Sequence, residues 1–282
     1  MLVALTWRTA VYLAMEHTSA DLHPTSIVQP DSQVDTGVVI GAFALVEGDV
    51  TIRENCVLSN HAIVRAGCDL ERSVEVDSFA VIGGRPQMRG ATAEFGRVRV
   101  GERTVIREGV TVHRPTRAQA VTAVGADCLL MAHSHVGHDS TVGNGVTLAN
   151  NVMLAGHVHV GEGVFIGGGA GVHQFVRIGR SAMIGGNASI SYDVPPFCIA
   201  ADRNEIRGLN IIGMRRLKLP LASVMDVKEC FHAVFSDHGN LRQRAADASR
   251  DGRLGITAEG RSFLEFFAVG TRGFAHARTR TR

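Results

Sequence analysis

The sequence predicts a mainly β fold, a parallel β-helix of hexapeptide repeats followed by a small C-terminal α-helical domain. The first observation is a large aliphatic residue at every sixth position from Val28 to Ile82, and again from Val124 to Ile190. A period of six fits neither a helix nor a two-residue strand repeat. It fits coils that bury their apolar faces only against neighbouring coils. The second observation is that apolar residues recur at helical spacing from about residue 203. The third is a content of 32 glycines and only 5% aromatic residues, which suits a narrow prism filled by aliphatic side chains.

Residues 1–22 are expected to be an N-terminal extension. Residues 1–15 are fairly apolar, but Arg8 interrupts them, and the stretch is shorter than the roughly 20 residues that span a bilayer. The basic segment that opens a signal peptide is also missing. We therefore expect neither a signal peptide nor stable membrane insertion. The stretch is interpreted as a short amphipathic helix, or as sequence upstream of a start at Met15.

Residues 23–196 are predicted to form the β-helix, in which three hexads make one coil of 18 residues. Two loop excursions, 83–97 and 113–122, leave the aliphatic pattern. Ile82 and Val100 are 18 residues apart, so the first excursion is expected to occupy one whole coil without shifting the register. Loops that protrude at a corner of such a prism are where a binding pocket is expected.

Residues 197–275 are predicted to form the α-helical domain. It follows Pro195 and Pro196, whose missing amide donors end strand pairing. Helices are expected over 204–218, 221–236, 240–250 and 257–269. The predicted buried stripe of the second helix is Leu221, Val224, Val227, Phe231 and Phe235. Residues 276–282 are a basic tail, which is expected to be a disordered, solvated end.

Charge and cysteine content argue against several classes of function. The net charge is only +2 over 282 residues, so bulk charge gives no support to nucleic-acid binding. The five cysteines are odd in number and scattered, and none forms a CxxC pair. Neither a disulfide framework nor a zinc ribbon is therefore predicted. We expect a reducing, cytoplasmic location.

Histidines cluster in the second half of the repeats, at His113, His133, His135, His138, His157, His159 and His173. A coil of 18 residues stacks His138, Gly156 and Gln174 in one column. The next column has Asp139 under His157. With coils roughly 4.8 Å apart, a base, a carboxylate and an unobstructed backbone lie within about 10 Å of one another.

This arrangement suits removal of a proton from a hydroxyl group. A mostly neutral imidazole at His138 can accept the proton, and Asp139 can fix its tautomer. The N–H of Gly156, if it faces the cleft, can donate to an oxyanion on a thioester carbonyl. No serine or cysteine stands out as a nucleophile, so direct transfer without an acyl-enzyme is the simpler hypothesis.

Longer stretches around these residues resemble the UDP-N-acetylglucosamine O-acyltransferases that begin lipid A synthesis. The matching stretches are His135–Asn144, Leu148–Asn151, Leu154–Val158, Val172–Phe175, Asp193–Pro196, Gly208–Asn210 and Gly270–Gly273. The resemblance implies a left-handed β-helix and a homotrimer. It also implies transfer of a 3-hydroxyacyl group from acyl carrier protein, whose phosphopantetheine carries the thioester, to the sugar 3-hydroxyl. No other cofactor and no metal are implied.

The resemblance also implies roles for individual residues. His138 would be the general base, Asp139 its orienting partner and Gly156 the oxyanion amide. The residues implied to line the sugar and acyl site are His113, His135, His157, His173 and Gln174. Asn210 and Arg216 are implied to bind the nucleotide. Gly186 is implied to set the length of the acyl chain.

Two places depart from the family pattern. The first excursion usually carries Asp-Leu-Lys-Tyr, which grips the acceptor, but here it reads Pro86-Gln87-Met88-Arg89-Gly90. Ile212 stands where some members have a glutamate, and Leu217 stands where a second arginine is common. The acceptor is therefore expected to be UDP-N-acetylglucosamine, or a modified (amino-)sugar nucleotide that a divergent paralogue acylates.

Three alternatives remain at this point. A sister acyltransferase of the same pathway has His-Asn in place of His138 and Asp139, and an N-terminal nucleotide-binding domain; neither feature is present in the sequence. A metal-dependent lyase resembling γ-class carbonic anhydrase matches the pair His133 and His138. It would lack its third zinc ligand, because Arg97 occupies that position. A non-enzymatic spacer would need no polar column.

Overall fold

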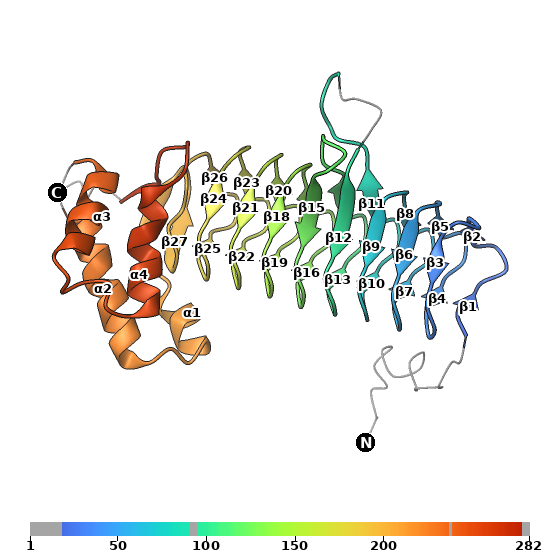
Figure 1. Cartoon of the computed structure of the whole chain (residues 1–282), viewed down its shortest axis with the longest axis horizontal. Coiled ribbons are helices and arrows are strands. Elements are labelled where there is room, and N and C mark those ends of the chain that lie inside the picture. The colour runs from blue at the N-terminus through green and yellow to red at the C-terminus, as the bar shows by residue number, and fades with distance from the viewer. Residues whose placement is uncertain (1–18, 91–94, 237–238, 278–282) are drawn as a thin grey trace.

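The computed structural model describes residues 19–90, 95–236 and 239–277. It shows stacked coils that form a long prism, with a group of helices at the C-terminal end (Figure 1). Most of the predicted N-terminal extension, residues 1–18, lies outside the described residues. In the described part of the chain, no helix is long and apolar enough to cross a membrane.

Each coil contributes one short strand to each of three sheets, so a sheet contains every third strand. The first sheet consists of β1 (Asp21–Leu22), β4 (Val39–Ile40), β7 (Val57–Leu58), β10 (Glu75–Val76), β13 (Val105–Ile106), β16 (Leu129–Leu130), β19 (Thr147–Leu148), β22 (Phe165–Ile166), β25 (Met183–Ile184), β27 (Cys198–Ala201), β28 (Glu205–Leu209) and β29 (His276–Ala277). The second consists of β2 (Ile27–Val28), β5 (Leu45–Val46), β8 (Ile63–Val64), β11 (Val81–Gly84), β14 (Thr111–His113), β17 (His135–Val136), β20 (Met153–Leu154), β23 (Gly171–Val172) and β26 (Ser189–Ile190). The third consists of β3 (Gln33–Val34), β6 (Val50–Ile52), β9 (Cys68–Leu70), β12 (Arg97–Val100), β15 (Val121–Val124), β18 (Thr141–Val142), β21 (His159–Val160) and β24 (Arg177–Ile178).

The aliphatic residue of each hexad fills the inside of the prism. Val136, Leu154 and Val172 pair with one another in parallel along the second sheet, and all three are buried. The residue two positions earlier, such as Val152 or Ala170, is buried as well. Because each coil covers the apolar face of the next, burial and strand pairing extend together along the prism. The predicted class, a parallel β-helix followed by helices, is confirmed.

Two loops project from the corner between the second and third sheets (Figure 1). Ile82 and Val100 lie on successive strands, and Val100 pairs with Leu70. The expectation that the first excursion occupies a whole coil was therefore wrong, since it is an insertion at a single corner. Its residues 91–94 are outside the described part. The second insertion lies beside the first, because the Arg97 N–H donates to the carbonyl of Ala120 at 3.2 Å.

The C-terminal end of the prism is closed by a strand where a helix was predicted. β28 runs antiparallel to β27, and β29 pairs with β28. The predicted helix over 204–218 is therefore wrong in its first half, because pairing with β27 satisfies a sheet edge that a helix would leave open. The predicted disordered tail is also wrong at His276 and Ala277, which form β29. Residues 278–282 are outside the described part.

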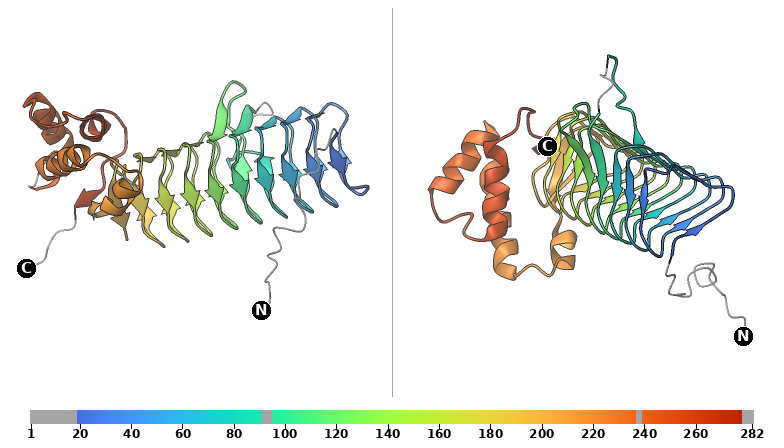
Figure 2. Two further views of the ribbon diagram at one scale, coloured as in Figure 1. Left: turned by 90° about the horizontal axis from the view of Figure 1, so that it is seen from below. Right: turned by 45° about the vertical axis from the view of Figure 1, so that its right-hand side comes forward.

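The helices are α1 (Ile211–Arg216), α2 (Leu221–Phe235), α3 (Leu241–Arg250) and α4 (Ala258–Glu265), and a 3₁₀ turn covers Phe266–Ala268. They pack together beside the end of the prism, as Figure 2 shows. The predicted stripe of α2 is only partly right, since Val227 is buried but Leu221 is 76% exposed. The buried face instead includes Asp226, whose carboxylate accepts hydrogen bonds from the N–H groups of Gly255 and Thr257, at 2.9 and 2.7 Å. Polar contacts with the loop before α4 thus set the rotation of α2.

A buried ion pair joins the helices to the prism. The Arg177 Nε donates to Asp193, whose side chain is fully buried, at 2.8 Å. The same guanidinium donates to the carbonyls of Phe266 and Val269 at 3.0 and 2.7 Å. Burial raises the pKa of Asp193, although Arg177 acts in the opposite direction. One guanidinium therefore pairs with the buried carboxylate and also donates hydrogen bonds to the carbonyls at the end of the helical segment.

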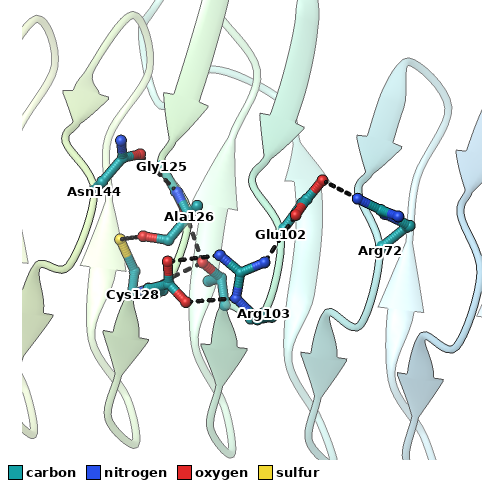
Figure 3. Close-up of polar contacts among 9 residues, drawn as sticks. Arg72, Glu102, Arg103, Gly125, Ala126, Cys128 and Asn144 are labelled. Carbon is teal, nitrogen blue, oxygen red and sulfur yellow. Dashed lines mark hydrogen bonds and ion pairs between the residues drawn. The ribbon is translucent and has the colours of Figure 1, made fainter.

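We predict that Arg177→Ala lowers the free energy of unfolding by about 3 to 5 kcal/mol, because it leaves a buried carboxylate without its partner. Chemical denaturation measures this. The matched control is Arg103→Ala. Arg103 binds Asp127 at 2.7 Å and Glu102 at 2.8 Å on an exposed corner (Figure 3). Water screens those pairs, so the control should change stability little. Equal losses in the two variants would contradict the prediction.

Candidate active site

His138 and Asp139 follow β17 at the corner from which the two loops project. The Nδ1 atom of His138 lies 2.8 Å from the Asp139 Oδ2, and the two side chains are 13% and 10% exposed. A carboxylate only accepts, so the proton between them belongs to Nδ1 and the lone pair is on Nε2. No described residue makes a hydrogen bond to Nε2. This is the arrangement that a general base needs.

Asp139 is held by several further contacts. The N–H of Thr116, from the second excursion, donates to its Oδ2 at 3.0 Å. The Nε2 of His157 lies 3.7 Å from the same oxygen, which confirms that His157 and Asp139 stack in one column. Burial alone would raise the pKa of Asp139, but hydrogen bonds from His138 and Thr116 outweigh burial and lower it. Asp139 therefore stays ionised beside the imidazole.

Gly156 lies directly against the ring of His138, as the coil spacing predicted. A Cβ at this position would stand 2.5 Å from Cε1 and 2.6 Å from Nε2 of His138. Any larger residue would therefore push the imidazole away. Among the described residues, the N–H of Gly156 has no hydrogen-bond acceptor, since the neighbouring bonds come from Ala155 and His157.

Aromatic rings extend the column that contains Asp139 and His157. His157 meets His138 edge-on, with ring centroids 5.2 Å apart. On its other side it stacks on Phe175 at 4.5 Å, and Phe175 is 46% exposed. Asp139, His157 and Phe175 all have left-handed backbone, with φ of 60°, 60° and 66°. The same corner turn thus repeats in each coil and stacks these side chains in one row, of which only Phe175 is exposed.

His113 and His135 extend the site toward the second sheet. Their ring centroids are 5.0 Å apart. His113 Nδ1 lies 2.6 Å from the carbonyl of Arg85, in the first excursion, and His135 Nδ1 lies 2.8 Å from the Thr111 hydroxyl. Burial, together with repulsion from neighbouring histidines, lowers the pKa of both rings, that of His135 to about 4, although the carbonyl of Arg85 partly opposes the decrease at His113. Both are therefore neutral near pH 7.

An open groove of about 660 Å³ runs along the second sheet from this cluster. Its polar lining includes Gln87 of the first excursion, His135 and His173. Its apolar lining includes Met153 and Val172. Ser189, Ser191 and Arg203 add further polar groups to the lining. A groove with both apolar and polar walls fits an amphiphilic ligand.

Comparisons with known proteins point to one family. The family profile for domain 2 of UDP N-acetylglucosamine O-acyltransferase matches residues 193–275, and that for the bacterial transferase hexapeptide matches 122–156. The acyl-[acyl-carrier-protein]–UDP-N-acetylglucosamine O-acyltransferase of Agrobacterium fabrum is 38% identical over 255 residues, which cover 90% of this chain and 94% of the relative. The chain belongs to the UDP-N-acetylglucosamine O-acyltransferase family.

Solved structures of O-acyltransferases have the same fold. LpxA from Acinetobacter baumannii matches with a TM-score of 0.86 at 30% identity, over 90% of this chain and 99% of that one. The UDP-N-acetylglucosamine O-acyltransferase from Moraxella catarrhalis matches with a TM-score of 0.84 at 30% identity, also over 90% and 99%. The predicted left-handed β-helix is thereby confirmed, together with the family.

The residues that the family resemblance assigns to acyl chain length and to nucleotide binding do not lie beside the histidine cluster of the same chain. Gly186 follows β25, at the corner between the first and second sheets. Asn210 caps α1: its Oδ1 accepts from the Gly213 N–H at 2.9 Å and its amide donates to the carbonyl of Ser181 at 3.0 Å. Ser181 lies at the third corner, between β24 and β25. Arg216, at the end of α1, is exposed. The three groups therefore occupy three different corners of the prism.

Two contacts of the site were missed by reasoning from the sequence. The N–H of Thr116 binds Asp139, which is 23 residues away in the sequence. The only feature of the sequence that pointed to Thr116 was its place in the second excursion. Arg272 donates to the carbonyl of Gln174 at 3.1 Å and also contacts His173. The only feature of the sequence that pointed to Arg272 was the match of Gly270–Gly273 to the family pattern, and that match does not indicate which residue Arg272 contacts.

The one group of possible metal donors among the described residues is His138, Asp139 and His157, whose ligand atoms all lie within 4.8 Å of one another. Two of them, His138 and Asp139, are the proposed general base and its partner, and His157 packs against both. The position at which the lyase alternative needs a third histidine holds Arg97, whose guanidinium binds Asp69 at 2.8 Å and Asp49 at 2.9 Å. The donor set of that alternative is therefore not assembled.

We predict that His135 makes the fold sensitive to acid. The ordinary histidine pKa is 6.5, whereas folding lowers that of His135 to about 4. Between these values the unfolded chain binds a proton that the folded chain does not, so the free energy of unfolding falls as pH drops. His135→Asn removes this proton. Its melting temperature should therefore fall less than that of the wild type between about pH 7 and about pH 5. Equal falls in both proteins would contradict the assignment.

Proposed function

We propose that the chain transfers a 3-hydroxyacyl group from the thioester of acyl carrier protein to the 3-hydroxyl of UDP-N-acetylglucosamine. The observation that carries this is the His138–Asp139 pair, with its free Nε2 against Gly156. The groove lies nearby, since its lining includes His135 and Ala155. Membership of the O-acyltransferase family supports the reaction class. Phosphopantetheine enters only as part of the donor, and the proposal uses no other cofactor or metal.

His138 acts as the general base. Its Nε2 takes the proton of the sugar 3-hydroxyl while that oxygen attacks the thioester carbonyl carbon. Asp139 keeps the other ring proton on Nδ1 and stabilises the imidazolium. When the tetrahedral intermediate collapses, the carbon–sulfur bond breaks and the imidazolium returns the proton to the leaving thiolate. The ester and the free thiol are the products, so no acyl-enzyme is required.

Gly156 supplies the oxyanion contact in this proposal. Its N–H has no acceptor among the described residues, so it is available to a developing negative charge. The same residue must be glycine because His138 occupies the space of a Cβ. His135, His157, His173 and Gln174 would bind the polar parts of the two substrates, and His113 would support His135.

Gln87 favours a second candidate acceptor. It lines the groove in the loop where the family usually has the residues Asp and Lys that grip the sugar. An uncharged amide there tolerates a change of the reacting hydroxyl to an amine. A UDP-sugar with a 3-amino group is therefore the alternative substrate, acted on by the same base.

We infer that the working enzyme is a homotrimer. His138, Gly186 and Asn210 with Arg216 occupy different corners of one prism, and flat prisms packed side by side would bring different corners together. Gly186 would then set acyl chain length, and Asn210 and Arg216 would bind the nucleotide, for the His138 of a neighbouring subunit. We also propose a cytoplasmic location, since all five cysteines are free and buried.

We predict that His138→Ala lowers acyl transfer by at least about 100-fold, the usual contribution of a general base. Acyl carrier proteins loaded with 3-hydroxyacyl chains of several lengths are assayed with UDP-N-acetylglucosamine and with its 3-amino analogue. Asp139→Asn should lose less, because the base itself remains. The control, His232→Ala, removes an exposed histidine on α2 and should keep full activity. Near-normal turnover by His138→Ala would remove it from this role, and no product with either acceptor would reject the function.

We predict that two inactive variants restore activity when mixed. In trimers assembled from equal amounts of His138→Ala and Arg216→Ala chains, about a quarter of sites shared between neighbours contain both native residues. Sites built within one chain would contain none. Activity of co-expressed chains is compared with that of each variant alone. Absence of recovery would contradict the shared site, and full activity of Arg216→Ala alone would remove that residue from it.

A further inference from the structure

The segment after the 3₁₀ turn returns from the helices to the prism next to the groove. The Asp193 N–H donates to the carbonyl of Gly273 at 2.8 Å, and the Ala275 N–H donates to the carbonyl of Asp193 at 2.9 Å. Between these points and the helices stands Arg272, which is half-buried. Its Nε donates to the carbonyl of Gln174 at 3.1 Å, and its Nη2 contacts the Nδ1 of His173.

The chemistry of this contact determines where the proton of His173 sits. A guanidinium is always charged and has only donors, so it cannot accept a hydrogen bond from an imidazole N–H. The Nδ1 of His173 also lies 3.3 Å from the carbonyl of Gln174, which only accepts, so this carbonyl and Arg272 favour opposite tautomers. That carbonyl already accepts from the Nε of Arg272, and the contact of Nδ1 with Arg272 is the shorter of the two. We therefore assign the lone pair of Nδ1 to Arg272, and in the neutral ring the proton is on Nε2. The Nε2 atom, which Arg272 does not bind, is the nitrogen left for a ligand in the groove that His173 lines.

Arg272 is not needed to attach this segment to the fold. The Arg177 guanidinium already binds the carbonyls of Phe266 and Val269. From α3, Arg242 binds the carbonyls of Ala268 and Gly270 at 3.2 and 2.9 Å. Two cations thus anchor the segment without touching the groove, whereas the side-chain contacts of Arg272 are directed at His173 and the backbone of Gln174.

We propose that Arg272 is a positioning residue for acyl transfer. It holds His173 in the tautomer with a proton on Nε2, so that this ring donates a hydrogen bond to a carbonyl or hydroxyl oxygen of the bound substrates. It also fixes the backbone of Gln174 beside the groove. The proposal rests on the proposed function for the identity of the substrates, but the tautomer itself is a property of the free protein.

The test compares Arg272→Gln with Arg272→Lys and with the matched control Arg242→Gln in the full chain. Proton–nitrogen correlation spectra of ¹⁵N-histidine-labelled protein report the tautomer of His173, whose signals are assigned with His173→Asn. The same proteins are assayed for kcat and KM with acyl carrier protein and UDP-N-acetylglucosamine, and their melting temperatures are measured.

We expect Arg272→Gln to change the nitrogen signals of His173 and to lower kcat roughly 10-fold, the value of one lost hydrogen bond. Lysine keeps a donor and should restore part of the loss. Arg242→Gln should lower the melting temperature with neither effect. The double variant Arg272→Gln/His173→Asn should be no slower than His173→Asn alone.

Unchanged His173 signals in Arg272→Gln, or a loss of activity equal to that of Arg242→Gln, would overturn the proposal. So would additive losses in the double variant. If the wild-type protein shows no acyl transfer, the proposed function fails, while the signals of His173 still decide whether Arg272 sets its tautomer.

Discussion

The hydrogen bonds between successive coils are the constraint on which the rest of the structure depends. The N–H of His135 donates to the carbonyl of Val152 at 2.8 Å, and the N–H of Met153 donates to that of Ala170 at 2.9 Å. These bonds cannot slip by a single residue without turning the buried aliphatic side chains outward. The register that keeps the core dry therefore also fixes His138 against Gly156, so that the packing of the interior determines the geometry of the site.

The corner turn converts this register into chemistry. Left-handed backbone is costly for residues with a Cβ, and Asp139, His157 and Phe175 adopt it because strand pairing on both sides determines the turn. Their side chains are stacked before any substrate arrives. Preorganisation of this kind is what makes a hydrogen-bonded base effective, since little motion is needed during the reaction. The insertions at the same corner add Thr116 and Gln87, which a smooth prism could not supply.

The helical domain contributes more than a cap. Asp193 is fully buried, and its ion pair with Arg177 fixes where the chain returns from the helices. Because of that return, Arg272 reaches His173, and α1 presents Arg216 at another corner. In our proposal the helices therefore act on two sites, on the groove of their own prism and on the nucleotide bound with a neighbouring prism.

The sequence by itself determined what repeats. The six-residue period predicted the prism, the aliphatic core, and the columns that place His138 against Gly156 and Asp139 under His157, because in a periodic fold a difference in number is a difference in position. Only the tertiary structure decided what is not periodic. The contact of Thr116 with Asp139, that of Arg272 with His173 and the strand β28 in place of a helix each depend on a partner distant along the chain. Local pattern carries no information about such partners, and neither the face of α2 nor the insertion at Ile82 could be read from spacing alone. All of these features have the same physical reason. An exposed sheet edge, a buried carboxylate or an unfilled corner needs a partner, and the partner is whichever segment the packing of the whole chain brings to that place.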